Sequence, residues 1–285
     1  MRPQAARQRF ESRGDPKGQS HRALRLRHAP SETIVMNRAV GVIPVRWSST
    51  RFPGKPLHLI AGKPLLRRVW ERSRRAKNLD LVIIATDDMR IAESAFNWGA
   101  EIALTSPDRR SGTDRVAEVA RHAKDFAFVV NIQGDEPLID PRLIDQLVNK
   151  LRSHSSIDIV TAAHPFADPA EAKSPHQNKV VLDRNNCALY FSRSMIPYVT
   201  NSSGVRYLRH QGIYGFRRDA LLQFVKWKPS PLERVESLEQ LRALENGVKV
   251  HVLITAKGSP GIDTPADAKA LERKLARTRR KVVLR

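Results

Sequence analysis

The chain has 285 residues and a formal net charge of +21, from 50 Lys and Arg against 29 Asp and Glu. This length allows one large domain with its own core, and the single cysteine, Cys187, excludes an internal disulfide framework and suits a reducing compartment. No apolar run is long enough to span a bilayer, and the first 30 residues lack the apolar segment of a secretory signal. We therefore expect a cytoplasmic protein with no membrane span.

The excess of positive charge lies mostly at the two ends of the chain. Residues 1–35 carry a net charge of +5 and residues 269–285 one of +7, which leaves +9 for the 233 residues between them. Basic ends bind nucleic acid through its phosphates, without sequence preference. A basic nucleic-acid-binding protein is therefore one alternative, although the mildly basic body between the ends suits a small anionic substrate.

Composition divides the chain into three segments. Residues 1–35 are rich in Arg, Gln and Ser and show no apolar periodicity, so we expect a disordered basic extension that ends just before Met36. An organelle-targeting peptide is the alternative for this segment. Residues 36–275 are expected to form a single α/β domain, and residues 276–285 a basic tail.

A cationic loop follows the first predicted strand, which covers residues 39–45. The loop, residues 46–57, reads RWSSTRFPGKPL; its Pro and Gly residues exclude regular structure, and it has no carboxylate to pair with its cations. Hydroxyls, backbone N–H groups and fixed positive charge beyond a buried strand are what a polyphosphate requires. We predict a triphosphate-binding loop, with a solvated basic loop as the alternative. Its candidate side chains are Arg46, Ser49, Thr50, Arg51 and Lys55.

The segment after this loop predicts a regular alternation of helices and strands. Helices are expected over residues 64–75, 89–98 and 141–151 and from about residue 111, and buried strands over residues 81–85, 99–105, 126–132 and 157–163. This alternation predicts a Rossmann-like α/β fold, with a mostly parallel sheet sandwiched by helices. Ligands of such sheets bind beyond the carboxyl ends of the strands, so polar residues at those ends are site candidates.

Two of these strand ends precede helices. Thr86 and Asp87 end the second strand, where they either cap the next helix or lie at the rim of a nucleotide site. Ser111 or Thr113 can cap a later helix, and Gly112 between them lets a flat ligand approach the backbone.

A third strand end carries carboxylates. Asp135 follows the apolar strand 126–132 and stands between Gln133 and Glu136. We predict Asp135 as a Mg²⁺ ligand, because Mg²⁺ takes one or two carboxylates together with phosphate oxygens and water. The alternative is a turn-forming Asp in a Gly-Asp-x-Pro segment.

The regular alternation ends at residue 165. Residues 165–208 contain strand-like segments at 179–183 and 188–191 around a predicted hairpin turn at 184–186. This small β-rich excursion is too short for a domain of its own, and we expect it to extend the sheet or cover a partner subunit.

The C-terminal part adds a second set of polar candidates. His210, Gly212 and Tyr214 share one face of the predicted strand 209–216, as a surface for a polyhydroxylated ligand or as a structural His–Tyr pair. One helix is expected up to Glu245, and Asp263 follows the last strand, where it either caps the final helix or joins the site.

Five motifs resemble, in family order, those of the sugar-nucleotide cytidylyltransferases, and most closely the 3-deoxy-manno-octulosonate (Kdo) cytidylyltransferases. They are RWSSTRFPGKPL at 46–57, SGTDR at 111–115, QGDEP at 133–137, RHQGIYG at 209–215 and GIDTP at 261–265, within a resemblance that spans residues 38 to about 275. The resemblance implies a fold of the nucleotide-diphospho-sugar transferase type. It implies transfer of a cytidylyl group from CTP to Kdo for lipopolysaccharide precursors, with Mg²⁺ as cofactor, and a homodimer without a specific nucleic-acid partner.

The motifs and the resemblance together assign roles to residues. The expected catalytic residues are Arg46, Lys55, Asp135 and Asp263, of which Asp135 and Asp263 are the metal ligands. Nucleotide contacts are expected from Arg46, Ser49, Thr50, Arg51, Lys55, Thr86, Asp87, Ser111, Gly112 and Arg115. Sugar contacts are expected from Gln133, Arg193, His210, Tyr214, Glu239 and Gln240. Gln211 stands where family members usually have Leu, and we expect no consequence for the chemistry.

Other activities remain open from the sequence. A cytidylyltransferase for sialic acid or for 8-amino-Kdo is the nearest alternative. A Rossmann oxidoreductase is disfavoured, because the chain lacks the G-x-G-x-x-G spacing of a dinucleotide site.

Overall fold

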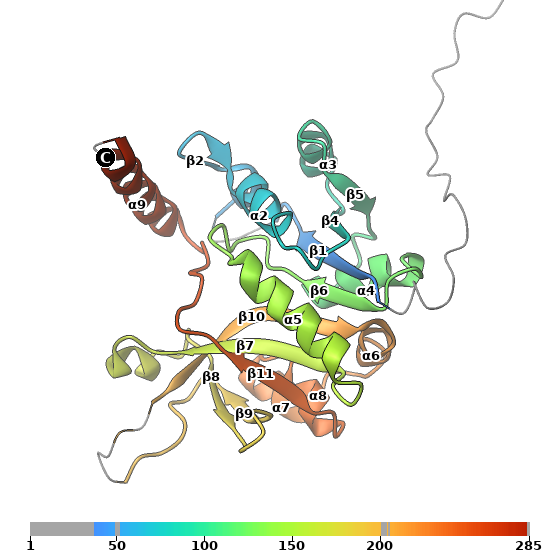
Figure 1. Ribbon diagram of the computed structural model, residues 1–285, viewed down its shortest axis with the longest axis vertical. Helices are drawn as coiled ribbons and strands as arrows, with labels where there is room; N and C mark the ends of the chain where they lie inside the picture. Colours follow the sequence, from blue (N-terminus) through green and yellow to red (C-terminus); the bar gives the residue numbers. More distant parts are fainter. Residues whose placement is uncertain (1–36, 49–51, 201–203, 205, 284–285) are drawn as a thin grey trace, which may run out of the picture.

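The structure, a computed structural model, describes residues 37–48, 52–200, 204 and 206–283. The predicted disorder of residues 1–35 and the loop residues Ser49, Thr50 and Arg51 therefore lie outside the described residues. Within the described part, nine strands form one sheet with helices on both faces, which confirms the predicted α/β class (Figure 1).

The sheet is mostly parallel. Its strands are β1 (Ala39–Val45), β4 (Leu81–Thr86), β5 (Glu101–Leu104), β6 (Phe128–Asn131), β7 (Ile159–Pro165), β8 (Lys179–Leu182), β9 (Ala188–Ser192), β10 (Leu208–Arg217) and β11 (Val250–Ile254). They run in the order β11-β7-β10-β6-β1-β4-β5, with β8 paired to β10 and β9 paired to β8. Of the strands in this order, β10 runs antiparallel to both neighbours, while the other pairs are parallel.

The excursion at 165–208 extends the sheet, as one of the two alternatives predicted. It begins with the short helix η2 (Pro169–Lys173) and continues as the antiparallel pair β8–β9. The turn of this pair lies at the predicted place, where Asn186 adopts a φ of 59° and donates its backbone N–H to Asp183.

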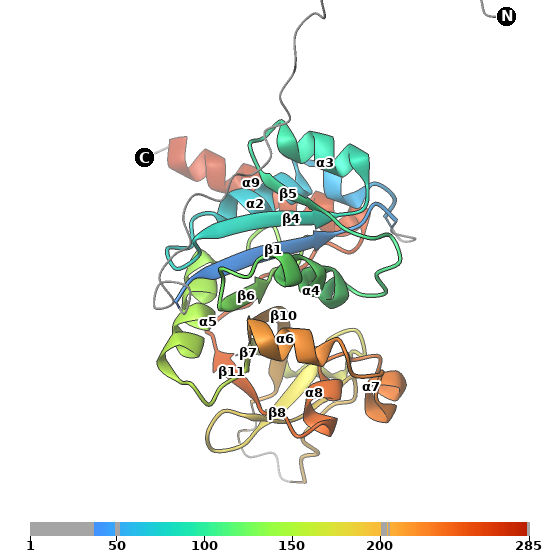
Figure 2. The ribbon, with the colours of Figure 1, turned by 90° about the vertical axis from the view of Figure 1, so that its right-hand side faces the viewer.

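Helices cover the two faces of the sheet and enclose two apolar cores. The α-helices of the described residues are α2 (Leu65–Ser73), α3 (Met89–Phe96), α4 (Gly112–His122), α5 (Pro141–Ser153), α6 (Arg218–Phe224), α7 (Pro231–Glu236), α8 (Leu241–Glu245) and α9 (Pro265–Val283). Buried residues of α2, α3 and α5 share one core, and those of α4, α6 and α8 share the other (Figures 1 and 2). None of the described helices is both long and apolar enough to cross a bilayer.

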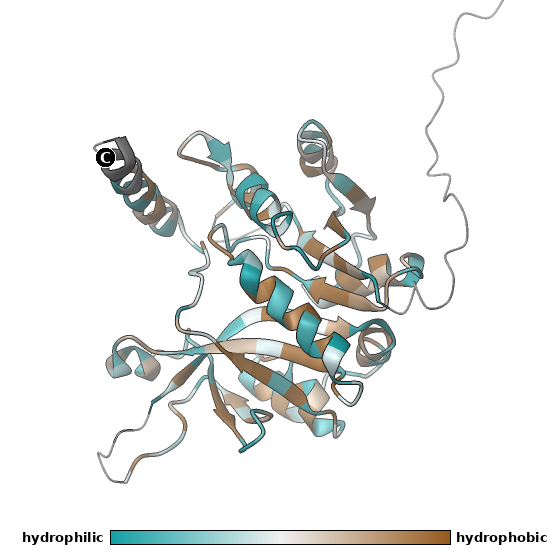
Figure 3. Ribbon diagram, viewed as in Figure 1, coloured by the Kyte–Doolittle hydropathy of each residue, from teal (hydrophilic) through white to brown (hydrophobic). Residues whose placement is uncertain are grey.

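The spacing of apolar residues explains these faces. In α5 the buried side chains recur with the helical period, at Leu143, Ile144, Leu147, Val148 and Leu151. Figure 3 shows the same division, with hydrophobic strands inside and hydrophilic outer helix faces. Burying each such side chain stabilises the fold by roughly 1.5–3 kcal/mol.

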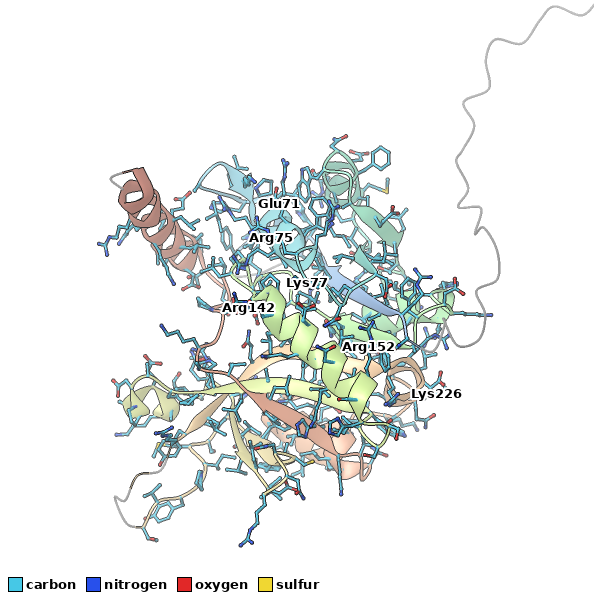
Figure 4. All side chains as sticks on the ribbon, viewed as in Figure 1. Glu71, Arg75, Lys77, Arg142, Arg152 and Lys226 are labelled. Atoms are coloured by element: carbon cyan, nitrogen blue, oxygen red, sulfur yellow. The ribbon has the colours of Figure 1, made fainter. Side chains whose placement is uncertain are left out.

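Charged side chains stand on the outer surface around α2 and α5. Figure 4 labels six of them: Glu71, Arg75, Lys77, Arg142, Arg152 and Lys226. Glu71 pairs with Lys63 at 2.8 Å and with Arg67 at 3.0 Å, and Arg152 donates to the backbone oxygen of Asn37. Part of this surface charge is therefore used in bonds within the fold.

The predicted single helix up to Glu245 is wrong. The chain forms α7 and α8 instead, separated at Ser237, whose φ of 51° lies in the left-handed region. Leu238, directly after this turn, is buried, and Glu239 accepts a hydrogen bond from Ser111 at the start of α4. Helix α6, directly after β10, was not predicted.

A third, smaller apolar cluster joins distant parts of the chain. It contains Phe52 from the cationic loop, Ile60 and Leu65 from the next segment, and Ile262, Ala268 and Leu271 from the C-terminal region. Residues 276–283 of the segment expected as a basic tail belong instead to α9, which continues to Val283. Packing in the third apolar cluster holds the start of α9 beside the loop that follows β1.

Candidate functional site

A cavity of about 500 Å³ lies at the carboxyl ends of β1 and β6. Its lining comes from four separate segments: Pro44, Val45, Arg46, Ser48, Lys55, Pro56, Leu65, Arg109, Arg110, Ser111, Gly112, Arg115, Gln133, Gly134, Asp135 and Asp263. Such a location is where open parallel sheets bind ligands. Most of the described residues predicted for the nucleotide and the metal therefore meet in one cavity.

The ammonium of Lys55 joins the two predicted metal ligands. Lys55 begins the short helix η1 (Lys55–Leu57), after Gly54 has turned the chain with a φ of 66°. Its Nζ lies 2.7 Å from Asp135 Oδ2 and 3.7 Å from Asp263 Oδ1. Asp135 and Asp263, 128 positions apart, are thus at one edge of the sheet, as the prediction requires.

The start of α9 explains the placement of Asp263. The backbone N–H of Ile262 donates to the oxygen of Asp135 at 2.9 Å, and the Ile262 side chain is buried in the third apolar cluster. Capping is done by the next residues, because Asp267 accepts from the backbone and hydroxyl of Thr264, whose hydroxyl accepts from Asp267 N–H. The side chain of Asp263 is left facing Lys55.

These two carboxylates fit the predicted Mg²⁺. Within the described residues no group of three or more His, Cys, Asp or Glu side chains forms a complete metal site. Mg²⁺ needs no such group, since it is usually held by one or two carboxylates with substrate phosphates and water. Asp135 and Asp263 already share one positive charge, so their oxygens converge as this binding mode demands.

The remaining charge of the cavity is positive. Arg46, Arg109, Arg110 and Arg115 line it in addition to Lys55. Arg109 pairs with Glu118 at 2.7 Å, whereas no ion pair with a described carboxylate is found for Arg46 or Arg110. Arg109 and Arg110 were not predicted as site residues, although the dibasic pair directly before SGTDR was a usable signal.

The amino-terminus of α4 carries the SGTDR motif. Ser111 is its N-cap and forms a capping box with Asp114. Gly112 packs closely on β1, because a side-chain Cβ there would lie 3.3 Å from Pro44. Arg115 is buried, lines the cavity and pairs with Asp87 at 3.1 Å.

Thr86 and Asp87, at the end of β4, make contacts within the protein. Neither residue lines the cavity, and the helix-capping role belongs to Asp88, which accepts from Arg90 N–H at 3.0 Å. Thr86 is fully buried and accepts from Asp88 N–H at 3.2 Å. Asp87 reaches the cavity through its partner Arg115, and direct nucleotide contact by Thr86 or Asp87 stays a prediction.

Four of the predicted sugar residues line a smaller pocket of about 80 Å³ beside the main cavity: Gln133, Tyr214, Glu239 and Gln240. Gln133 borders both spaces, so the two are neighbours. Two polar atoms at this pocket, Oδ1 of Asn131 and Nε2 of Gln240, are buried without a hydrogen-bond partner. Asn131 was not predicted, and its amide has the polarity that a hydroxyl-rich ligand requires.

Glu239 connects the sugar pocket to the nucleotide helix. It accepts hydrogen bonds from the hydroxyls of Ser111 at 2.8 Å and Thr113 at 2.5 Å. Burial raises the pKa of Glu239, against the lowering effect of these two bonds and of Arg242. Arg242 is buried, and the carboxyl of Glu239 faces the start of α4.

His210 is enclosed rather than open to the pocket. Its Nε2 lies 3.0 Å from the hydroxyl of Thr161, and its ring packs on Phe191 and Tyr214 at centroid distances of 5.0 and 5.5 Å. Burial lowers the pKa of His210 to about 3. Burial also raises the pKa of Tyr214, with a further contribution from the charge of Glu239.

Arg193 lies outside both pockets. Its guanidinium donates to the backbone oxygens of Glu236, Ser237 and Pro175 at 2.7, 3.3 and 3.1 Å. Arg193 therefore ties the excursion to the end of α7 in this structure. The sugar contact expected from it stays a prediction, and it is not brought together with the other sugar residues.

Gln211 has a role that the sequence did not predict. Its side-chain amide donates a hydrogen bond to the buried carboxyl of Glu136 at 3.0 Å, and Glu136 directly follows Asp135 in the sequence. Burial raises the pKa of Glu136 to about 7, the bond from Gln211 lowers it, and the charge of Asp135 raises it. An apolar side chain at position 211 would leave this carboxyl without its amide donor.

Comparison with known proteins points to one activity. The family model described as "Cytidylyltransferase" matches residues 40–250. A 3-deoxy-manno-octulosonate cytidylyltransferase of Pseudomonas fluorescens is 47% identical over 247 residues, covering 82% of this chain and 96% of the relative. The enzyme of the same name from Fusobacterium nucleatum is 43% identical over 225 residues, covering 79% of this chain and 91% of the relative.

A solved structure agrees with these relatives. The structure of CMP:2-keto-3-deoxy-manno-octonic acid synthetase in complex with CTP is 40% identical in sequence, with a TM-score of 0.82. The match covers 85% of this chain and 99% of that one.

The buried state of His210 predicts a pH dependence of stability. The pKa of His210 in the folded protein, about 3, lies below the ordinary value of 6.5. The contribution of the neutral imidazole to stability is therefore present above pH 6.5 and is lost as the pH falls toward 3. Between pH 7 and 5 the free energy of unfolding of the native chain should fall by about 2 kcal/mol more than that of His210→Gln, at about 1.36 kcal/mol per pKa unit. Denaturant titrations at the two pH values measure this difference.

The exposed His176 provides the control. The variant His176→Gln should keep the pH dependence of the native chain. Equal pH dependence in His210→Gln and the native chain would contradict a buried neutral imidazole.

Proposed function

The chain belongs to the cytidylyltransferase family, and we infer that it transfers the cytidylyl group of CTP to 3-deoxy-manno-octulosonate and releases pyrophosphate. The relatives support the substrate pair by name, and the structure supplies a site with the required chemistry. The observation that carries the proposal is the meeting of Lys55, Asp135 and Asp263 in one cationic cavity beyond β1 and β6.

The cations of the cavity would bind the triphosphate. Transfer at the α-phosphorus requires the nucleophile in line and the charge of the phosphate oxygens neutralised, with little covalent help from the protein. Arg46, Lys55 and Arg110 supply fixed positive charge, and Arg109 and Arg115 extend it toward the start of α4. These side chains would hold the pyrophosphate leaving group as negative charge develops on it.

We propose Mg²⁺ as the cofactor, held by Asp135 and Asp263. When bound, Mg²⁺ would neutralise phosphate charge and lower the pKa of the anomeric hydroxyl of the sugar acid. The two carboxylates keep their relative position through the backbone bond between Ile262 and Asp135. No dedicated side-chain base is needed in this scheme.

The smaller pocket would bind the sugar acid. Tyr214, Glu239 and Gln240 present a phenol, a carboxyl and an amide to it, and Gln133 stands between it and the triphosphate. Hydroxyl groups are recognised by such a mixture of donors and acceptors. The hydrogen bonds from Ser111 and Thr113 to Glu239 would couple the sugar pocket to the nucleotide side of the site.

We further propose a cytoplasmic homodimer that uses the excursion. Leu189 on β9 and Tyr198 in the segment after it are 62% and 88% exposed, and Val235 on α7 is 83% exposed. Hydrogen bonds from Ser192 and Arg193 to the carboxylate of Glu236 hold the excursion against α7. These exposed apolar side chains belong to segments that are bonded to each other, and a contiguous exposed apolar patch would mark an association surface.

Substrate choice is the first expected outcome. With Mg²⁺, the protein should release pyrophosphate from CTP and Kdo at least about 100 times faster than from UTP or ATP with Kdo, or from CTP with sialic acid. A coupled assay of pyrophosphate release measures all four mixtures. Faster turnover with sialic acid than with Kdo would move the assignment to another 2-keto sugar acid.

The second expected outcome concerns the loss of a carboxylate that is proposed to bind the metal. Asp135→Ala should fold normally and lose more than about 100-fold in kcat/KM, because a group that stabilises transition-state charge is removed. The matched control is Asp219→Ala, since Asp219 is exposed and far along the chain from the cavity segments. Turnover at the native rate in Asp135→Ala would remove the metal assignment.

The third expected outcome concerns the proposed homodimer. Leu189→Asp should convert a dimer into a monomer, measured by size-exclusion chromatography with light scattering. Leu104→Asp is the matched control, because Leu104 is 61% exposed on β5 at the other end of the sheet. A Leu189→Asp protein that remains dimeric would place the interface elsewhere.

A further inference from the structure

Lys55 makes three contacts that fix its ammonium between two carboxylates. Its Nζ lies 2.7 Å from Asp135 Oδ2, 2.9 Å from the backbone oxygen of Ile262 and 3.7 Å from Asp263 Oδ1. The side chain is 17% exposed, whereas Asp135 and Asp263 are 31% and 55% exposed. The lysine side chain is thus more buried than either aspartate side chain, and its ammonium lies where the two carboxylates converge.

The two carboxylates do not depend on Lys55 for their proximity. The backbone bond from Ile262 N–H to Asp135 O crosses between the same two segments. The side chain of Ile262 is buried with Phe52 and Leu271 in the third apolar cluster, and Thr264 and Asp267 satisfy the start of α9. Removal of the ammonium would therefore leave the pair of carboxylates in place.

A divalent cation shared by these carboxylates would compete with the ammonium. Mg²⁺ binds oxygen at about 2.0–2.1 Å, so a shared ion would lie among the same oxygens that Lys55 contacts. Two cations at such separations repel each other strongly, particularly where water is partly excluded. Lysine and metal are therefore alternatives at this place.

The cavity also provides the group that would draw the lysine away. Apart from Asp135 and Asp263, its described lining contains no carboxylate, and its other charges are the arginines 46, 109, 110 and 115. An ammonium that leaves the aspartates finds no new carboxylate among the described lining residues, so its new anionic partner would be the ligand. A triphosphate supplies such oxygens, and the flexible stem of a lysine allows the movement.

We propose that Lys55 occupies the place of the divalent cation until the nucleotide arrives, and that metal and lysine exchange there. This proposal rests on the metal site of the proposed function and deepens it. It makes metal binding conditional on nucleotide binding, since the triphosphate both removes the competing ammonium and contributes oxygen ligands. The nucleotide-free protein is then a weak metal binder despite two convergent carboxylates.

The test measures Mn²⁺ binding without any nucleotide. Mn²⁺ is a paramagnetic substitute for Mg²⁺, and its free concentration is read from its electron paramagnetic resonance signal during titration of the full-length protein. Lys55→Met should bind Mn²⁺ at least tenfold more tightly than the native chain. Lys55→Gln provides a second variant, and thermal unfolding identifies a variant that does not fold.

Two controls separate exchange from a general change in charge. Lys63→Met removes one positive charge from an ion pair with Glu71 that lies outside the cavity, and should leave Mn²⁺ affinity unchanged. Adding Asp135→Asn to Lys55→Met should abolish the gain. Folded Lys55→Met and Lys55→Gln proteins that bind Mn²⁺ no more tightly than the native chain would overturn the proposal.

The outcome does not depend on turnover. Native protein that releases pyrophosphate from CTP and Kdo, with no gain of Mn²⁺ affinity in the lysine variants, would leave the proposed function intact and remove the exchange. A gain of affinity in a protein that does not use CTP would support the exchange and remove the proposed function.

Discussion

Parallel pairing of β1 with β6 is the constraint on which the candidate site depends. The register aligns Val42 with Asn131, so the loops that follow the two strands leave the sheet at the same edge. The contact between these loops is close, because a Cβ at Gly134 would lie 3.0 Å from Val45 Cγ2 and 3.4 Å from Pro44 O. A glycine before Asp135 therefore lets the carboxylate reach the side chain of Lys55.

The C-terminal segment adds the part of the site that sheet pairing alone does not supply. Residues 255–264 cross from β11 to α9, and Ile262 meets both the backbone of Asp135 and the side chain of Phe52. Apolar burial and one backbone bond thus bring a charged residue into place over a long sequence separation. The ion pairs of Lys55 are made possible by this packing.

Much of this arrangement was predictable from sequence, because it follows from local patterns. Apolar periodicity predicted the helices up to α5. Strand ends together with family motifs predicted that Asp135 and Asp263 lie at the same edge of the sheet. The break at Ser237 was not predictable from the same periodicity, because Leu238, Leu241 and Leu244 keep a helical spacing after it and no Gly or Pro marks it. Nor were the carbonyl contacts of Arg193 or the bond from Gln211 to Glu136, because both arise from segments that are distant in sequence.

The antiparallel strand β10 has a consequence for how the chain is made. It lies between β6 and β7 although it is translated after both. As the nascent protein leaves the ribosome, β1, β4, β5 and β6 can pair first, and one side of β6 stays open until residues 208–217 emerge. An open strand edge is a template for wrong pairing, so the second half of the sheet joins late and through a step exposed to aggregation. We therefore expect an overproduced nascent chain to be most prone to aggregation after β6 has been synthesised and before β10 has.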